Sequence, residues 1–95
     1  MARRTTVNDT LVLQLLFAPG CSQCQSAKSM ARKVTATFDP SLLQYEEIDV
    51  IEALDYAVAL GVTHTPAIVL DGELPFVSKP SEAPLRTAIE DRLQP

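Results

Sequence analysis

Apolar side chains gather in three short runs along the chain, and these runs predict the strands of one sheet. The run at residues 11–17 is almost uninterrupted, which is typical of a strand buried on both faces of a parallel sheet. Further runs at residues 42–50 and 67–70 predict two more strands. In the second run the apolar phase changes between Tyr45 and Ile48, so we expect a bulge or a strand end there.

The dipeptide Asp71-Gly72 is the strongest turn signal in the chain. A pair of this kind between apolar runs favours a two-residue hairpin turn, which predicts a returning antiparallel strand at residues 74–77. Pro75 lies inside that strand and cannot donate a hydrogen bond to a neighbour, so we expect the strand to form an edge of the sheet.

Apolar residues that recur three and four positions apart predict three helices, at residues 22–37, 52–60 and 81–93. Gly61 suits the C-terminal cap of the second helix, and Ser81 suits the N-cap of the third. The residues that we expect to face the core are Ala27, Met30, Ala31, Val34 and Phe38, then Ala53, Leu54, Ala57, Val58 and Leu60, then Leu85, Ala88, Ile89 and Leu93.

The predicted order of elements is β-α-β-α-β-β-α, which indicates an α/β fold. Two strand–helix units favour a parallel arrangement of the first strands, and the hairpin adds antiparallel pairing. We therefore expect a four-stranded mixed sheet with helices on both faces. The length of 95 residues predicts a single domain over residues 1–95, with its core at about residues 11–93.

The composition is that of an ordinary globular domain, with 46% apolar and 21% charged residues. The net charge of −4 and the lack of a basic run give no support for nucleic-acid binding. No apolar stretch approaches the roughly 20 residues that span a bilayer.

The first residues loosely resemble a lipoprotein signal that ends at Cys21. Polar Asn8, Asp9 and Gln14 and the proline at position 19 disfavour that interpretation. We expect a cytoplasmic protein with neither a nucleic acid nor a membrane as a partner.

Cys21 and Cys24 are the only cysteines, and they lie where the first strand passes into the first helix. A helix N-terminus stabilises a thiolate, so we expect Cys21, as N-cap or first-turn residue, to be the exposed nucleophile. Cys24, about one turn deeper, can close a disulfide with it and act as the resolving thiol. Two thiols and the single histidine are too few for a closed zinc site, and no metal is expected.

Three segments, "FAPGCSQC", "THTPAIV" and "DGE", together with the order of elements, resemble the thioredoxin/glutaredoxin superfamily, particularly its small redox-active disulfide proteins. The resemblance covers residues 11–93. It implies a thioredoxin-like fold and a cis Thr65–Pro66 bond whose proline packs against the disulfide. A cis bond there would expose the backbone of Thr65 to an extended substrate, and the Thr65 hydroxyl could hydrogen-bond a thiolate.

The chain departs from the family at several site positions. Ser22 and Gln23 stand between the cysteines, where thioredoxins carry Gly-Pro and glutaredoxins Pro-Tyr. Leu15 stands where thioredoxins carry a buried acid, so water or another base must take the proton of Cys24. His64 either borders the site and stabilises a thiolate or is an exposed loop residue.

These residues favour a dithiol–disulfide oxidoreductase that needs no cofactor beyond the Cys21–Cys24 pair. Its expected partners are a disulfide-containing protein or small molecule, and a reductase or thiol that supplies electrons. The alternatives are a glutathione-linked or iron–sulfur-binding glutaredoxin relative, a Cu(I) carrier, and a protein-binding module without catalysis. Lys28 and Arg32 are the residues that could hold glutathione, while the acids at positions 46, 47, 49 and 52 are expected to be solvated.

Overall fold

The structure is a computed structural model that describes residues 10–76 and 80–93. Strands and helices alternate along it as the apolar pattern predicts. In chain order they are β1 (Leu11–Phe17), α1 (Cys24–Thr35), β2 (Leu43–Asp49), α2 (Leu54–Leu60), β3 (Ala67–Leu70) and α3 (Glu82–Leu93).

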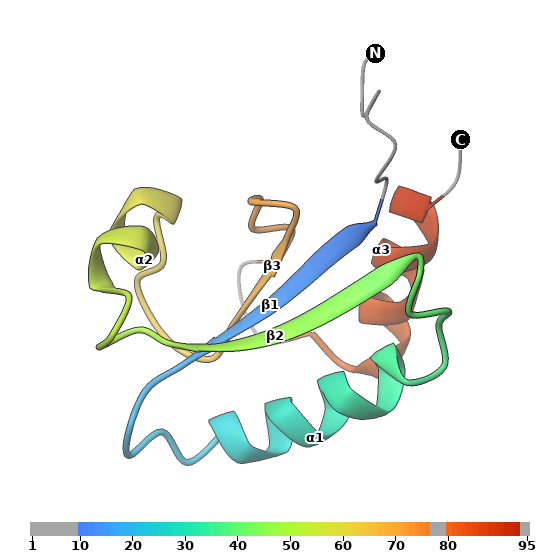
Figure 1. Ribbon diagram of the computed structural model, residues 1–95. Coiled ribbons are helices and arrows are strands. Elements are labelled where there is room, and N and C mark those ends of the chain that lie inside the picture. Colours follow the sequence, from blue (N-terminus) through green and yellow to red (C-terminus); the bar gives the residue numbers. More distant parts are fainter. Residues whose placement is uncertain (1–9, 77–79, 94–95) are drawn as a thin grey trace.

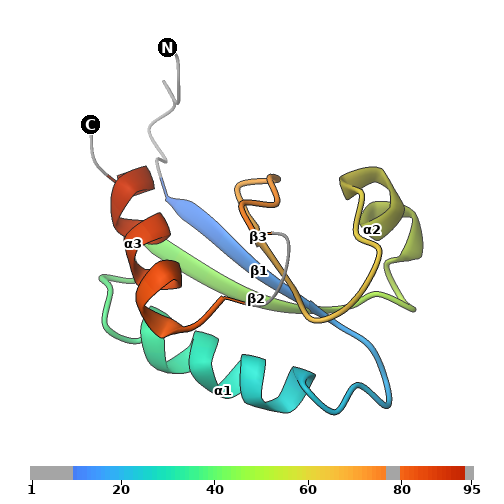
Figure 2. The same cartoon turned by 180° about the vertical axis from the view of Figure 1, so that it is seen from behind.

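The sheet has the strand order β2-β1-β3, so β1 is its central strand. β2 runs parallel to β1, from the pair Leu11 and Leu43 to the pair Phe17 and Asp49. β3 runs antiparallel to β1, which makes the sheet mixed as expected. Figures 1 and 2 show α1 and α2 on opposite sides of the sheet, and α3 shares the core cluster of α1, so helices cover both faces.

The main core fills the space between the sheet and helices α1 and α3. Side chains alternate between the two faces of a strand, and the odd-numbered leucines of β1 all point to this face. The buried members of the cluster are Leu11, Leu13, Leu15, Ala27, Ala31, Val34, Leu43, Ile68, Leu70, Leu85 and Ile89. The predicted inner stripes of the first and third helices are therefore confirmed.

A smaller cluster on the opposite face joins α2 to the sheet through Leu16, Ala57 and Val69. Ile48 packs against this cluster, whereas Tyr45 packs against the main core. The change of apolar phase within β2 therefore reflects a change in which face of the strand is covered, from the main core at Tyr45 to the smaller cluster at Ile48. The parallel register with β1 continues unbroken through it, so the expected bulge is not present.

The predicted fourth strand does not form in the part of the chain that the structure describes. The turn itself is as expected, because Asp71 and Gly72 both have positive φ angles, of 49° and 81°. Beyond it, pairing stops at one bridge between Leu70 and Glu73. Pro75 has no N–H to extend the ladder, and Val77 lies outside the described residues.

The predicted inner face of α2 is only partly correct. Ala57 is buried, but Leu54 and Val58 are 56% and 68% exposed, so they do not face the core. The reason is that α2 has seven residues and covers only the end of the sheet around Leu16. The cap is confirmed, because Gly61 ends the helix with φ 84°.

We expect Leu13→Ala to lower the free energy of unfolding by about 2–5 kcal/mol, because it leaves a cavity in the main core. Urea denaturation measures this as a lower midpoint at an unchanged m value. Leu42→Ala is the control, since Leu42 is 48% exposed and should cost less than about 1 kcal/mol. Equal losses in the two variants would contradict the placement of Leu13.

Candidate functional site

Three loops meet where β1 ends: the loop from β1 to α1, the turn before α2 and the loop that enters β3. The register pairs Leu16 with Ala67, the first residue of β3, and Pro66 directly precedes Ala67, so it lies near the end of β1. On the other side the N–H of Val50 donates to the carbonyl of Phe17 over 2.9 Å. The loop that carries Cys21 leaves β1 at this end, opposite the end where β1 begins (Figure 1).

The two cysteines form a disulfide across a tight turn. Their Cα atoms are 5.4 Å apart, and the N–H of Cys24 donates to the carbonyl of Cys21 over 3.3 Å. A second bond of the same length joins the N–H of Cys21 to the carbonyl of Ala18. The backbone therefore holds the pair at bonding distance at the end of the central strand.

Helix α1 begins at Cys24, later than predicted, with Gln23 as its N-cap. Cys21 precedes the helix and is therefore neither its N-cap nor a first-turn residue. The cause is the turn at the cysteines. The carbonyl of Cys21 accepts a hydrogen bond from the N–H of the residue three positions later, whereas an α-helix requires the residue four positions later. Cys24 is only 4% exposed, whereas Cys21 is half-buried and Ser22 and Gln23 are exposed.

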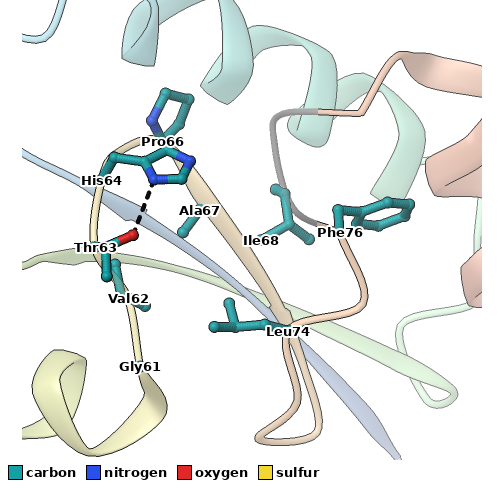
Figure 3. Close-up of a pocket in the computed structure, with 9 residues that line it drawn as sticks. All are labelled: Gly61, Val62, Thr63, His64, Pro66, Ala67, Ile68, Leu74 and Phe76. Atoms are coloured by element: carbon teal, nitrogen blue, oxygen red, sulfur yellow. Dashed lines mark hydrogen bonds between the residues drawn. The ribbon is translucent and has the colours of Figure 1, made fainter.

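The other side of the site is the loop that enters β3. The Thr65–Pro66 peptide bond is cis. Pro66 is buried and Thr65 half-buried, while His64 is exposed. The ring nitrogen Nδ1 of His64 lies 3.1 Å from the hydroxyl of Thr63 (Figure 3), so this histidine engages its own loop.

A pocket of about 350 Å³ lies beside Pro66. Figure 3 shows it between the loop that enters β3 and the segment beyond the Asp71-Gly72 turn. Most of its lining residues are apolar, and His64 and Thr63 supply polar groups at its edge. Its lining residues are Gly61, Val62, Thr63, His64, Pro66, Ala67, Ile68, Leu74 and Phe76. An apolar side chain of a bound molecule suits this hollow.

A charged cluster lies on the face of the sheet that α1 covers, beside Leu15. Glu47 pairs with Leu15 across the strands and accepts two 2.7 Å hydrogen bonds from the guanidinium of Arg32. The hydroxyl of Tyr45 donates a third to the same carboxylate over 2.7 Å. The bonds from Arg32 lower the pKa of Glu47, while burial raises the pKa of Tyr45.

Glu47 is therefore not solvated as expected, because its side chain is only 19% exposed. The ammonium of Lys28 lies 3.7 Å from the centre of the Phe17 ring, in a cation–π contact. Lys28 follows Cys24 by four residues, so the two share a side of α1. The helical spacing could have indicated Lys28, whereas the approach of Glu47 to Leu15 depends on strand register.

No group of three or more histidine, cysteine or acidic side chains that could hold a metal is found within residues 10–76 and 80–93. The helices described for this chain are all too short or too polar to cross a bilayer.

The family model of the thioredoxin domain matches residues 11–90 of the chain. A thioredoxin from Methanocaldococcus jannaschii is 32% identical over 81 residues, which cover 85% of this chain and 94% of that protein. A probable thioredoxin from Methanothermobacter thermautotrophicus is 27% identical over 82 residues, covering 86% of this chain and 95% of that one.

Solved structures give the same result. A thioredoxin variant from Halobacterium salinarum superimposes with a TM-score of 0.77 at 30% identity, covering 93% of this chain and 78% of that one. A thioredoxin from Malassezia sympodialis superimposes with a TM-score of 0.76 at 21% identity, covering 92% and 78% of the two chains, which supports the fold alone.

We expect Glu47→Gln to lower the free energy of unfolding at pH 7 by about 1 kcal/mol, because the ion pair with Arg32 is lost. The pKa of Glu47 is lowered by folding, so its stabilisation is complete above the unfolded pKa of about 4.3 and disappears as the pH falls further. The variant and the parent should therefore converge as the pH falls below the folded pKa of Glu47. Urea denaturation across this range tests the prediction, with exposed Glu90→Gln as control; a pH-independent difference would contradict it.

Proposed function

Because the chain belongs to the thioredoxin family and holds its two cysteines as a disulfide, it is a thiol–disulfide oxidoreductase, and we propose that it works as a reductase with Cys21 as nucleophile and Cys24 as resolving thiol. The redox group is the cysteine pair itself. The two matched relatives are a thioredoxin and a probable thioredoxin, which supports reduction of the partner's disulfide as the direction of the reaction.

The observation that carries the assignment of roles is the difference in burial within the pair. Cys24 is 4% exposed, whereas Cys21 is half-buried in a loop at the end of the sheet. Only the sulfur of Cys21 can be approached by a partner's disulfide without a rearrangement of α1. Cys24 is placed to attack the sulfur of Cys21 from the buried side, because the turn keeps the two cysteines at bonding distance.

Reduction proceeds in two exchanges. The Cys21 thiolate attacks one sulfur of the partner's disulfide, which forms a mixed disulfide and releases the partner's other sulfur as a thiolate. Cys24 then loses its proton to solvent and attacks the sulfur of Cys21. The Cys21–Cys24 disulfide closes again, the second partner sulfur leaves as a thiolate, and water protonates the two products. Two electrons have passed to the partner.

Position 15 holds a fully buried leucine, so no acid at this position can take the proton of Cys24. We propose that Lys28 compensates in part. Its ammonium is held over Phe17, one helical turn beyond Cys24, where a positive charge favours the thiolate over the thiol. Glu47 cannot serve as the base in the same way, because Arg32 and Tyr45 occupy its oxygens.

A protein disulfide suits the site better than glutathione does. The two basic residues of α1 that could hold its carboxylates are already engaged, Lys28 by Phe17 and Arg32 by Glu47. The half-buried Thr65 next to Pro66 offers its backbone to an extended segment of a partner protein. The adjoining pocket would then receive an apolar side chain of that segment.

The oxidised protein needs a supply of electrons, either from a reductase or from a small thiol. A reducing pool of this kind is typical of the cytoplasm, which we propose as the compartment of the protein.

We expect Cys21→Ser to abolish the reduction of insulin disulfides, because no thiolate is left to form the mixed disulfide. Cys24→Ser should instead accumulate a covalent adduct with its substrate, which mass spectrometry detects as the added mass. The Leu42→Gln variant provides a folded control with unchanged turnover. Retained turnover in Cys21→Ser would overturn the assignment of the nucleophile.

We expect the reduction potential of the Cys21–Cys24 pair to lie near the value of about −270 mV that is typical of thioredoxin. Equilibration with defined ratios of reduced and oxidised dithiothreitol, followed by thiol alkylation, measures it. A potential near the value of about −120 mV typical of a periplasmic oxidant would reverse the proposed direction.

A further inference from the structure

Three large apolar side chains stand in solvent along α2 and the turn before it. Ile51, Leu54 and Val58 are 65%, 56% and 68% exposed. Leu54 and Val58 are four residues apart on the helix and so share one of its sides. Ile51 lies three residues before Leu54, in the turn that leads into α2. We call these three residues the α2 stripe.

Negative charge borders the α2 stripe. Glu52 and Asp55 lie next to it in sequence and are exposed. Neither carboxylate forms a salt bridge with any residue in the described part of the chain. The ion pairs of the described residues all lie elsewhere, on α1, α3 and β2 and at Glu73. The stripe therefore offers apolar contact together with two unneutralised charges, which suits a partner with cationic groups.

The α2 stripe lies at the same end of the sheet as the disulfide. Val50, one residue before the stripe, is hydrogen-bonded to Phe17, the last residue of β1. The chain reaches Cys21 four residues after Phe17. Figure 1 shows α2 and the loop from β1 to α1 at this end of the molecule. A protein whose disulfide meets Cys21 is therefore bound at the end of the sheet where α2 also lies.

A second copy of the chain suits the α2 stripe less well. A symmetric contact would bring Glu52 and Asp55 of one copy against the same acids of the other, in a protein whose net charge is −4. Three side chains also offer much less area than the roughly 800 Å² per partner of a stable interface. A short-lived contact during disulfide exchange needs no more than a small patch.

We propose that the α2 stripe docks the protein with which Cys21 exchanges disulfides, and that this partner presents apolar side chains bordered by lysine or arginine beside its own disulfide. The inference rests on the proposed oxidoreductase function and adds a property of its partner. Apolar contact with Leu54 and Val58 contributes affinity, and attraction to Glu52 and Asp55 favours encounter and orientation.

Three synthetic peptides test the proposal with the full chain in its reduced form. Each carries one cysteine in a mixed disulfide with thionitrobenzoate, whose release on attack by Cys21 is followed by absorbance in a stopped-flow instrument. The first peptide has leucines and lysines beside the cysteine, the second has glutamates in place of the lysines, and the third has serines in place of the leucines. Ellman's reagent, which has no peptide, measures the basal reactivity of Cys21.

We expect the leucine–lysine peptide to react at least about tenfold faster than either of the others with the parent protein. The double variant Leu54→Gln/Val58→Gln should lose the preference for leucine over serine. The double variant Glu52→Gln/Asp55→Asn should lose the preference for lysine over glutamate and keep that for leucine. Leu42→Gln, an exposed apolar control away from α2, should keep both preferences, and all variants should react equally with Ellman's reagent.

Each other outcome is decisive. Equal rates for the three peptides, or preferences that survive in both α2 variants, overturn the docking role while reaction with Ellman's reagent shows that the oxidoreductase function stands. A parent protein that fails to react with Ellman's reagent overturns the proposed function itself. Dimerisation in sedimentation velocity that Leu54→Gln/Val58→Gln abolishes assigns the stripe to a second copy instead.

Discussion

The hydrogen bonding of β1 to a neighbour on each side is the constraint on which the rest of the structure depends. β2 fixes one side of the strand in parallel register, and β3 fixes the other in antiparallel register. The end of β1 at Phe17 therefore decides where Cys21 emerges, where Pro66 enters β3, and where the turn before α2 attaches. The site is assembled from three distant parts of the sequence because all three are anchored to one strand end.

The same strand explains the unusual distribution of charge near the disulfide. Leu15 keeps the centre of the core apolar, so no isolated carboxylate has to be buried there, which would be costly without a partner. The nearest acid on that face is Glu47, one strand away, and it is neutralised by Arg32 and bonded by Tyr45. Lys28 is left as the charged group nearest Cys24 along the helix. Under the proposed mechanism, this cation takes the place of a buried acid at Cys24.

Helix α2 packs on the sheet and also exposes large apolar side chains. Ala57 is buried beside Leu16 and Val69, and Leu60 packs against the same cluster. The larger side chains Leu54 and Val58 contribute little burial to the isolated chain, although their apolar character resembles that of core residues. The sequence pattern predicts an inner face for α2, whereas the structure exposes part of that face. The two agree if these side chains become buried only against a partner.

The sequence by itself determined the order of the elements, the inner stripes of α1 and α3, the Gly61 cap and the turn at Asp71-Gly72, because each depends on periodicity or on one residue's backbone preference. The spacing of Cys21 and Cys24 likewise indicated the redox pair. The start of α1 at Cys24 follows from the turn at the cysteines, and the limit of hairpin pairing at Glu73 follows from Pro75, so both have local causes. Tertiary structure alone decided the exposure of Leu54 and the meeting of Glu47 with Leu15. These two features depend on how far a helix extends over the sheet and on register between strands, which are relations between distant segments that no local pattern encodes.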